Sequence, residues 1–91
     1  APGFVLQSRA RGDEEPPRVG YTVSKKVGNA VVRNRVRRRL REVVRLSGAA
    51  RMQTGRDYVL VGRRAALDLA FDRLIDDMSG ALSRVNRADR R

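Results

Sequence analysis

The sequence contains no cysteine, no histidine and no tryptophan. Without histidine or cysteine there is no Ser/His or Cys/His nucleophile, no imidazole acid or base, and no Cys/His zinc site. Without cysteine no disulfide can stabilise a small domain outside the cell, so we expect a cytoplasmic setting. The chemistry that remains is that of carboxylates, amides, hydroxyls and basic groups.

Long apolar runs and aromatic side chains are also scarce. No run approaches the ~20 apolar residues that span a bilayer, and no charged-then-apolar segment opens the chain. We therefore expect neither a membrane span, nor a secretory signal, nor a membrane partner. The aromatic residues are Phe4, Tyr21, Tyr58 and Phe71. Each suits a core position better than base stacking. A chain of 91 residues suffices for a single domain over 1–91.

Positive charge is abundant and unevenly distributed. The net charge is +11, and residues 18–64 hold 14 Lys and Arg against Glu42 and Asp57, a balance of +12. The remainder has seven Arg against eight acidic residues, a balance of −1. Such concentration predicts a nucleic-acid partner. A membrane-surface helix is the alternative, but such helices bury Trp, Phe or Leu rather than Val.

The basic segment is predicted to be a helix, with Asn29 as its N-cap and Gly48 as its stop. Apolar residues recur at helical spacing and form one buried stripe. The stripe consists of Val32, Val36, Leu40, Val43 and Val44. A core-facing helix is therefore expected over residues 29–48.

The other face of this helix is crowded with arginine. At about 100° per residue it holds Asn34, Arg37, Arg38, Arg41 and Arg45. Arg33 falls at the edge of the apolar stripe, and Arg35 and Arg39 fall on the opposite flank. Like charges four residues apart cost about 0.2–0.5 kcal/mol per pair, so helix stability does not explain this face. Guanidinium binds phosphate bidentately, which favours a polyanion-binding surface over a merely solvated basic face.

The rest of the chain predicts a small sheet and a second helix. The expected elements are strands at 4–6, 18–26 and 58–61, a loop at 11–17, a helix over 71–85 and a loose tail at 87–91. Asp68 is the candidate N-cap of the second helix. The apolar run 58–61 suits a central strand covered on both faces. The fold class is α+β, a two-layer α/β sandwich with a small mixed sheet, a βαβ crossover and two helices.

Two groups of side chains outside the basic helix could form a ligand site or a metal site. Small residues at Gly20, Thr22 and Ser24 leave one face of the second strand open for a helix or a ligand. An acidic group on the second helix is better explained as a solvated face than as a Mg²⁺ site. This group comprises Asp68, Asp72, Asp76 and Asp77. We therefore assign no metal ligand and no catalytic residue to the chain.

The run SKKVGNAVVRNRVRR at residues 24–38 resembles the signature of the bacterial ribonuclease P protein subunit. The flanks FVL at 4–6, RVGYTV at 18–23 and DYVLVGRR at 57–64 resemble that family too. The resemblance implies a left-handed βαβ crossover, although right-handed crossovers form about 98% of such units. The family usually begins with an additional helix and strand, which we expect to be absent from these residues.

The resemblance also implies a function. The chain would be the non-catalytic subunit of an endonuclease that removes the 5′ leader of precursor tRNA, while an RNA subunit and its Mg²⁺ hydrolyse the phosphodiester. Its partners would be ribonuclease P RNA and precursor tRNA, with no small-molecule substrate and no cofactor held by the protein alone. A structural RNA-binding protein of ribosomal type is the alternative. Duplex DNA binding is a weaker alternative hypothesis, because no helix directly precedes the basic one as a helix-turn-helix arrangement requires.

The family's binding residues are carried over only onto matching positions. Contacts to the RNA subunit are expected from Lys25, Lys26, Asn29, Arg33, Asn34, Arg35, Arg37, Arg38, Arg41 and Arg45. The cleft for the single-stranded leader is expected at Phe4 and Tyr21 on the open side of the sheet. Gln7 stands where the family favours an aromatic residue facing that cleft.

Overall fold

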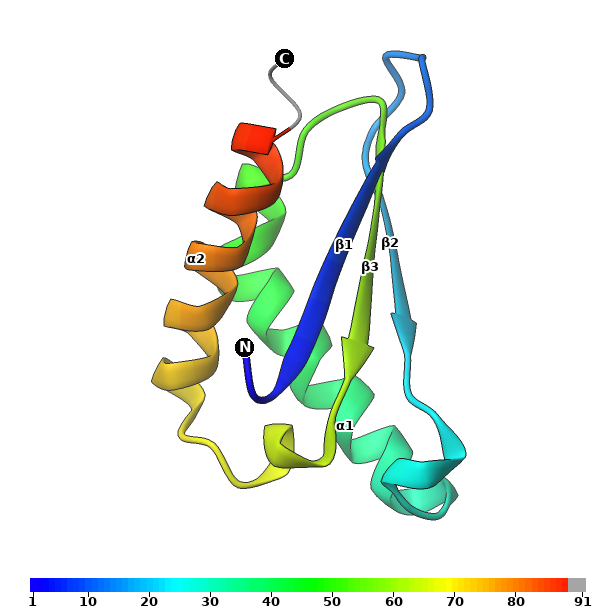
Figure 1. Ribbon diagram of the computed structural model, residues 1–91, viewed down its shortest axis with the longest axis vertical. Helices are drawn as coiled ribbons and strands as arrows, with labels where there is room; N and C mark the ends of the chain where they lie inside the picture. Colours follow the sequence, from blue (N-terminus) through cyan, green and yellow to red (C-terminus); the bar gives the residue numbers. More distant parts are fainter. Residues whose placement is uncertain (89–91) are drawn as a thin grey trace.

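The computed structural model describes residues 1–88. Its main elements are β1 (Phe4–Ala10), β2 (Arg18–Thr22), α1 (Ala30–Val43), β3 (Arg56–Gly62) and α2 (Phe71–Ala88) (Figure 1). Short helical turns occupy Lys25–Val27, Ala49–Arg51 and Arg64–Leu67, and a π-helical turn occupies Val44–Gly48. The predicted order of strand, strand, helix, strand, helix is confirmed.

The sheet is mixed, and β3 is its central strand. The strand order is β1-β3-β2, with β1 antiparallel and β2 parallel to β3. The parallel pair is joined through α1, so β2, α1 and β3 form the predicted βαβ unit. In Figure 1, α1 lies behind strands that run downward, and β3 lies to the left of β2. This arrangement is a left-handed crossover, as the resemblance implied and against the general preference.

Both helices cover the same face of the sheet, which makes a two-layer structure. One hydrophobic core fills the space between the layers. Its fully buried larger members are Phe4, Val36, Leu40, Val43, Tyr58, Leu60, Leu74, Met78 and Leu82. On the other face Val59 and Val61 are half-buried and Gln7 and Gly20 are exposed. The expectation that 58–61 would be covered on both faces was therefore wrong.

The start of α1 is as predicted, but its end is different. Asn29 Oδ1 accepts a hydrogen bond from the Val32 amide at 3.0 Å, which confirms the N-cap. At the other end the helix changes to a π turn at Val44, and the helical path continues through a 3₁₀ turn to Arg51. Gly48 has φ −104°, so it is no left-handed cap. It is buried instead, and a Cβ there would lie 3.4 Å from Met78 Cγ.

Three other predicted boundaries also need correction. The second strand ends at Thr22, because Lys25–Val27 forms a 3₁₀ turn. Asp68 closes the 3₁₀ turn Arg64–Leu67, and α2 begins only at Phe71, so Asp68 is not its N-cap. The α2 helix passes through Gly80 and includes residues 87 and 88, which were expected in a tail. The rest of that tail, 89–91, lies outside the described residues.

Arg11 closes the end of the sheet opposite the Lys25–Val27 turn. Its guanidinium donates to Asp57 Oδ1 at 2.7 Å and to Asp13 at 3.2 Å. The hydrogen bond from Arg11 is the main cause of a lowered pKa of Asp13. The loop passes so close to Gly55, at φ +72°, that a Cβ there would meet the Asp13 carbonyl oxygen at 2.1 Å.

Candidate nucleic-acid interface

The basic face belongs to α1, whose opposite face is fixed on the sheet. Val36, Leu40 and Val43 are fully buried. Gly62 at the end of β3 permits this close approach, since a Cβ there would lie 2.6 Å from Val36 Cγ1. Because these contacts set the rotation of the helix, they also set where every arginine on it points.

Most of the predicted RNA-contacting side chains face solvent. The exposed ones are Lys25, Lys26, Asn29, Asn34, Arg35, Arg38, Arg41 and Arg45. Arg33 and Arg37 are half-buried on the flank of the helix. Arg37 donates to Asn34 Oδ1 at 3.0 Å, which holds two members of this face together. The structure therefore gathers all ten predicted residues along α1, the turn before it and the π-helical turn that continues it.

Two of the exposed arginines have partners within the protein. Arg45 pairs with Glu42, and the hydrogen bond from Arg45 lowers the pKa of that carboxyl group. The Arg41 guanidinium carbon lies 5.5 Å from the centre of the Tyr21 ring, in cation–π geometry. Burial raises the pKa of Tyr21, and the charge of Arg41 opposes that shift. Arg41 is thus held over the edge of the sheet rather than swinging freely.

Arg39 has a structural role within the fold. It donates to the carbonyl oxygens of Leu67 at 3.1 Å and of Leu69 at 3.0 Å. Its guanidinium also lies 5.7 Å from the centre of the Phe71 ring. These contacts tie α1 to the connection between β3 and α2, so Arg39 is separate from the exposed basic face.

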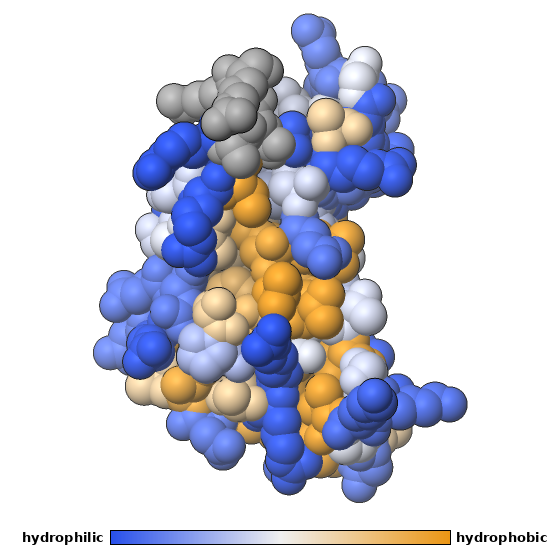
Figure 2. All heavy atoms as spheres, in the orientation of Figure 1, coloured by the Kyte–Doolittle hydropathy of each residue, from blue (hydrophilic) through white to orange (hydrophobic). Residues whose placement is uncertain are grey.

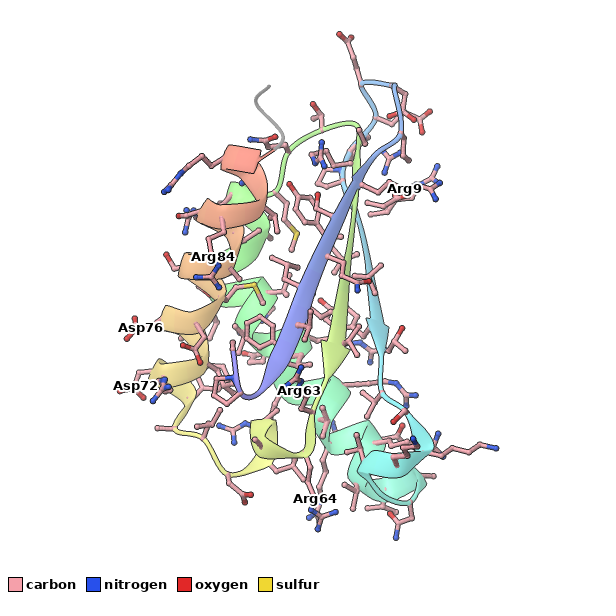
Figure 3. All side chains as sticks on the ribbon, in the orientation of Figure 1. Arg9, Arg63, Arg64, Asp72, Asp76 and Arg84 are labelled. Carbon is pink, nitrogen blue, oxygen red and sulfur yellow. The ribbon has the colours of Figure 1, made fainter. Side chains whose placement is uncertain are left out.

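The structure adds Arg63 and Arg64 to the predicted set. Both are exposed, and Arg64 Nη1 donates to the Val27 carbonyl oxygen at 2.9 Å, which places it at the turn before α1. Figure 3 shows both labelled arginines at the end of the sheet where that turn lies. The sequence carried a usable signal: parallel strands end at the same edge of a sheet, so residues directly after β3 must lie near those after β2.

The two predicted leader-contacting aromatic residues do not lie on the open face. Phe4 is fully buried between sheet and helices, so its assignment to an open cleft was wrong. Tyr21 lies on the same side, half-buried below Arg41. Strand alternation explains both positions, because Phe4 and Tyr21 pair with Gly62 and Leu60, whose side of β3 faces the helices.

The open face instead carries a shallow polar hollow of about 420 Å³. It is lined by Gln7, Ser8, Arg9, Asp57 and Val59. Figure 3 shows Arg9 pointing away from the helices. Asp57 is partly neutralised, because it accepts the hydrogen bond from Arg11. The Ser8 hydroxyl faces the helix side, where it accepts a hydrogen bond from Arg56 Nε at 2.9 Å. The hollow therefore offers the Gln7 amide and the Arg9 guanidinium group, with one apolar side chain.

The carboxylates of α2 lie away from this basic region. Figure 3 shows Asp72 and Asp76 pointing outward from the side of α2 that faces away from the sheet. Within residues 1–88, no group of three His, Cys, Asp or Glu residues is arranged to hold a metal ion.

Neither helix in that part of the chain is long and apolar enough to span a bilayer. The surface in Figure 2 shows apolar side chains exposed between α2 and β1, flanked by hydrophilic ones.

Comparison with known proteins gives consistent matches. The family model described as Ribonuclease P matches residues 1–86. The ribonuclease P protein component of Gluconacetobacter diazotrophicus is 49% identical over 85 residues, which cover 93% of this chain and 73% of the relative. The same component of Paramagnetospirillum magneticum is 48% identical over 89 residues, covering 93% and 67%.

Solved structures agree with the sequence relatives. The Staphylococcus aureus RNase P protein has a TM-score of 0.73 at 26% identity, covering 93% of this chain and 76% of that one. The Thermotoga maritima RNase P protein has a TM-score of 0.74 at 27% identity, covering 90% and 76%. The basic helix, the mixed sheet and these matches together show that the chain belongs to the ribonuclease P protein family.

Proposed function

We propose that this chain acts as the protein subunit of ribonuclease P and binds the RNA subunit chiefly through phosphates along α1. The observation that carries this proposal is the exposed row of arginines on a helix whose opposite face is fully buried. The one acidic residue of α1, Glu42, is already paired with Arg45. No other carboxylate of α1 can neutralise this face, so its arginines can bind an external anion. Guanidinium groups match the geometry of phosphate.

Precursor tRNA is the second proposed partner, bound by its 5′ leader on the open face of the sheet. The hollow of about 420 Å³ lies on the face that the helices leave uncovered. Its lining contains no aromatic side chain, and a stacked base is worth about 1–3 kcal/mol. Charge and hydrogen bonds from Arg9 and Gln7 would then hold the leader. We expect such binding to be tolerant of leader sequence.

Hydrolysis is assigned to the RNA subunit and the Mg²⁺ ions that it binds. The protein's part is to neutralise phosphates where RNA strands crowd together, which lowers the Mg²⁺ concentration that the folded RNA needs. Arginine side chains repel Mg²⁺, so the ions would be held by RNA oxygens and not by the α1 face. A cytoplasmic location would place the protein with the tRNA precursors.

The experiment is reconstitution with a bacterial ribonuclease P RNA and a precursor tRNA at limiting Mg²⁺. The wild type should stimulate cleavage, whereas Arg37→Gln combined with Arg41→Gln should bind the RNA subunit more weakly. The slope of log affinity against log salt should flatten by about 1–2 units, at ~0.7–0.9 per phosphate contact.

The matched control changes two arginines of α2, Arg73→Gln with Arg84→Gln, and should leave the slope as in the wild type. A protein that binds the RNA but never stimulates cleavage would favour the structural RNA-binding alternative. An unchanged slope in the α1 double variant would place the RNA surface elsewhere.

A further inference from the structure

A second polar hollow lies at the far end of the molecule from the Lys25–Val27 turn. It has a volume of about 390 Å³ and is lined by Arg51, Gln53, Ser83, Asn86 and Arg87. It is formed by the C-terminal half of α2 and the connection from α1 to β3, which Figure 1 shows together at one end of the protein. At ~1.5 Å per residue, the 14 residues of α1 separate it from the Lys25–Val27 turn by about 20 Å.

The guanidinium of Arg51 is held in a fixed position at this hollow. Its Nη1 donates to the carbonyl oxygen of Ser79 at 2.9 Å and to the Ser79 hydroxyl at 2.6 Å. Its Nη2 donates to the Ser83 hydroxyl at 2.5 Å. These partners are neutral, so they orient the guanidinium without cancelling its charge. A charged group ordered in advance loses little conformational entropy when it binds an anion.

The amide side chain of Asn86 is equally well fixed. Its Nδ2 donates to the Arg51 carbonyl oxygen at 3.0 Å, and its Oδ1 accepts from the buried Tyr58 hydroxyl at 2.9 Å. The Tyr58 oxygen in turn accepts from the backbone N–H of Gln53 at 3.0 Å. This network joins three segments of the chain around the hollow, so its walls are tied together by hydrogen bonds, two of them partly buried at Tyr58.

The lining has the chemistry of an anion site. Every lining residue carries a side-chain hydrogen-bond donor, two carry a full positive charge, and none is acidic. Arg87 is exposed, and the residues one turn before it on α2 are Ser83 and Arg84, which give it no helical ion pair. Two arginines that face one hollow repel each other unless an anion lies between them.

We propose that the hollow between Arg51 and Arg87 is a phosphate-binding site separate from the α1 surface. The phosphate is either a backbone phosphate of bound RNA or that of a free phosphorylated ligand. The serine contacts use three of the five N–H donors of Arg51, so its Nε–H and second Nη2–H meet one side of the group, and Arg87 closes over the other. Gln53 and Asn86 supply neutral donors to the remaining oxygens.

The test is a titration of the whole protein with inorganic phosphate, followed by nitrogen-15 NMR. We expect saturable shifts of the side-chain amide signals of Gln53 and Asn86. These shifts should disappear in Arg87→Gln and persist in Arg84→Gln, which removes the same charge one turn earlier on α2. They should also persist in the Arg37→Gln, Arg41→Gln double variant, so failure of the α1 proposal and failure of this one remain distinguishable.

A second arm measures affinity for ribonuclease P RNA and identifies the source of the phosphate. If RNA supplies it, Arg87→Gln should weaken binding about three- to tenfold and flatten the salt slope by ~0.7–0.9, whereas Arg84→Gln should not. If phosphate binding is lost and RNA affinity is unchanged, the ligand is a free phosphorylated molecule. The proposal is overturned if wild-type Gln53 and Asn86 show no saturable shifts, or if Arg84→Gln and Arg87→Gln reduce phosphate binding equally.

Discussion

Two adjacent arginines of α1 should behave in opposite ways when each is changed to glutamine. Arg38 is exposed on the basic face. Arg39 donates to the carbonyl oxygens of Leu67 and Leu69 and lies over the ring of Phe71. Both substitutions remove one positive charge from neighbouring positions of the same helix. Any difference between them therefore reports on where the side chain points.

The magnitude follows from the contacts of Arg39. A hydrogen bond from a charged donor contributes about 1.5–3 kcal/mol, and a partly exposed cation–π contact adds about 0.5–1 kcal/mol. Arg39 is half-buried, so water can replace part of what the freed carbonyl oxygens lose. We expect Arg39→Gln to lower the free energy of unfolding by about 2–3 kcal/mol. For a domain of this size that corresponds to a fall in Tm of about 10–20 °C.

Thermal unfolding followed by circular dichroism gives the stability of both variants, and RNA affinity over a series of salt concentrations gives the slope. Arg38→Gln should keep the wild-type Tm and flatten the slope by ~0.7–0.9. Arg39→Gln should lose stability and, measured below its Tm, keep the wild-type slope. The reasoning is refuted if Arg39→Gln has the Tm of the wild type and its slope of log RNA affinity against log salt is flattened.

Three further outcomes are expected. Gly62→Ala should lower the free energy of unfolding by about 1–3 kcal/mol, because its Cβ would overpack the core. Gly20→Ala is the control and should leave stability nearly unchanged, since its Cβ would have its nearest neighbour 4.0 Å away. Equal denaturation midpoints for the two variants would contradict this. Asp76→Asn combined with Asp77→Asn should leave reconstituted cleavage within about threefold, while a loss near 10³, ~4 kcal/mol, would mean that they hold a catalytic metal. The lowered folded-state pKa of Asp13 stabilises the fold above the unfolded pKa of ~3.9, and this contribution is lost as pH falls through the folded value. Asp13→Asn should therefore flatten the fall in unfolding free energy between about pH 5 and 3, and a curve that keeps its wild-type steepness would exclude the aspartate as its cause.

Local sequence patterns were sufficient for the start of α1 and for which side of it is buried, but not for where it ends. Its N-cap at Asn29 and its buried stripe through Val36 and Leu40 follow from spacing and side-chain type, and the structure confirms them. The exposed arginine face follows from the same spacing, because a helix with one buried side has only one other side to present. Composition alone excludes imidazole and thiol catalysis, since the chain has neither histidine nor cysteine.

Contacts between distant segments were not visible in those patterns. The sequence placed Arg39 on a flank, but only the fold brings the Leu67 and Leu69 carbonyl oxygens within reach of it. The pattern favoured Phe4 as a core residue and the family resemblance assigned it to the leader cleft; the register of β1 on β3 decides that it faces the helices. A one-residue shift of that register would move it to the open face.

The sequence by itself thus determined the basic helix, its buried side and the anion-binding chemistry of its exposed side, because helical period and charge act over a few neighbouring residues. The tertiary structure alone decided which face of the sheet stays open and that Arg63 and Arg64 join the turn before α1. It also decided that Arg51 and Arg87 share one hollow. These are properties of strand order, register and the packing of α2, and they depend on pairs of residues about 30 or more positions apart in the chain.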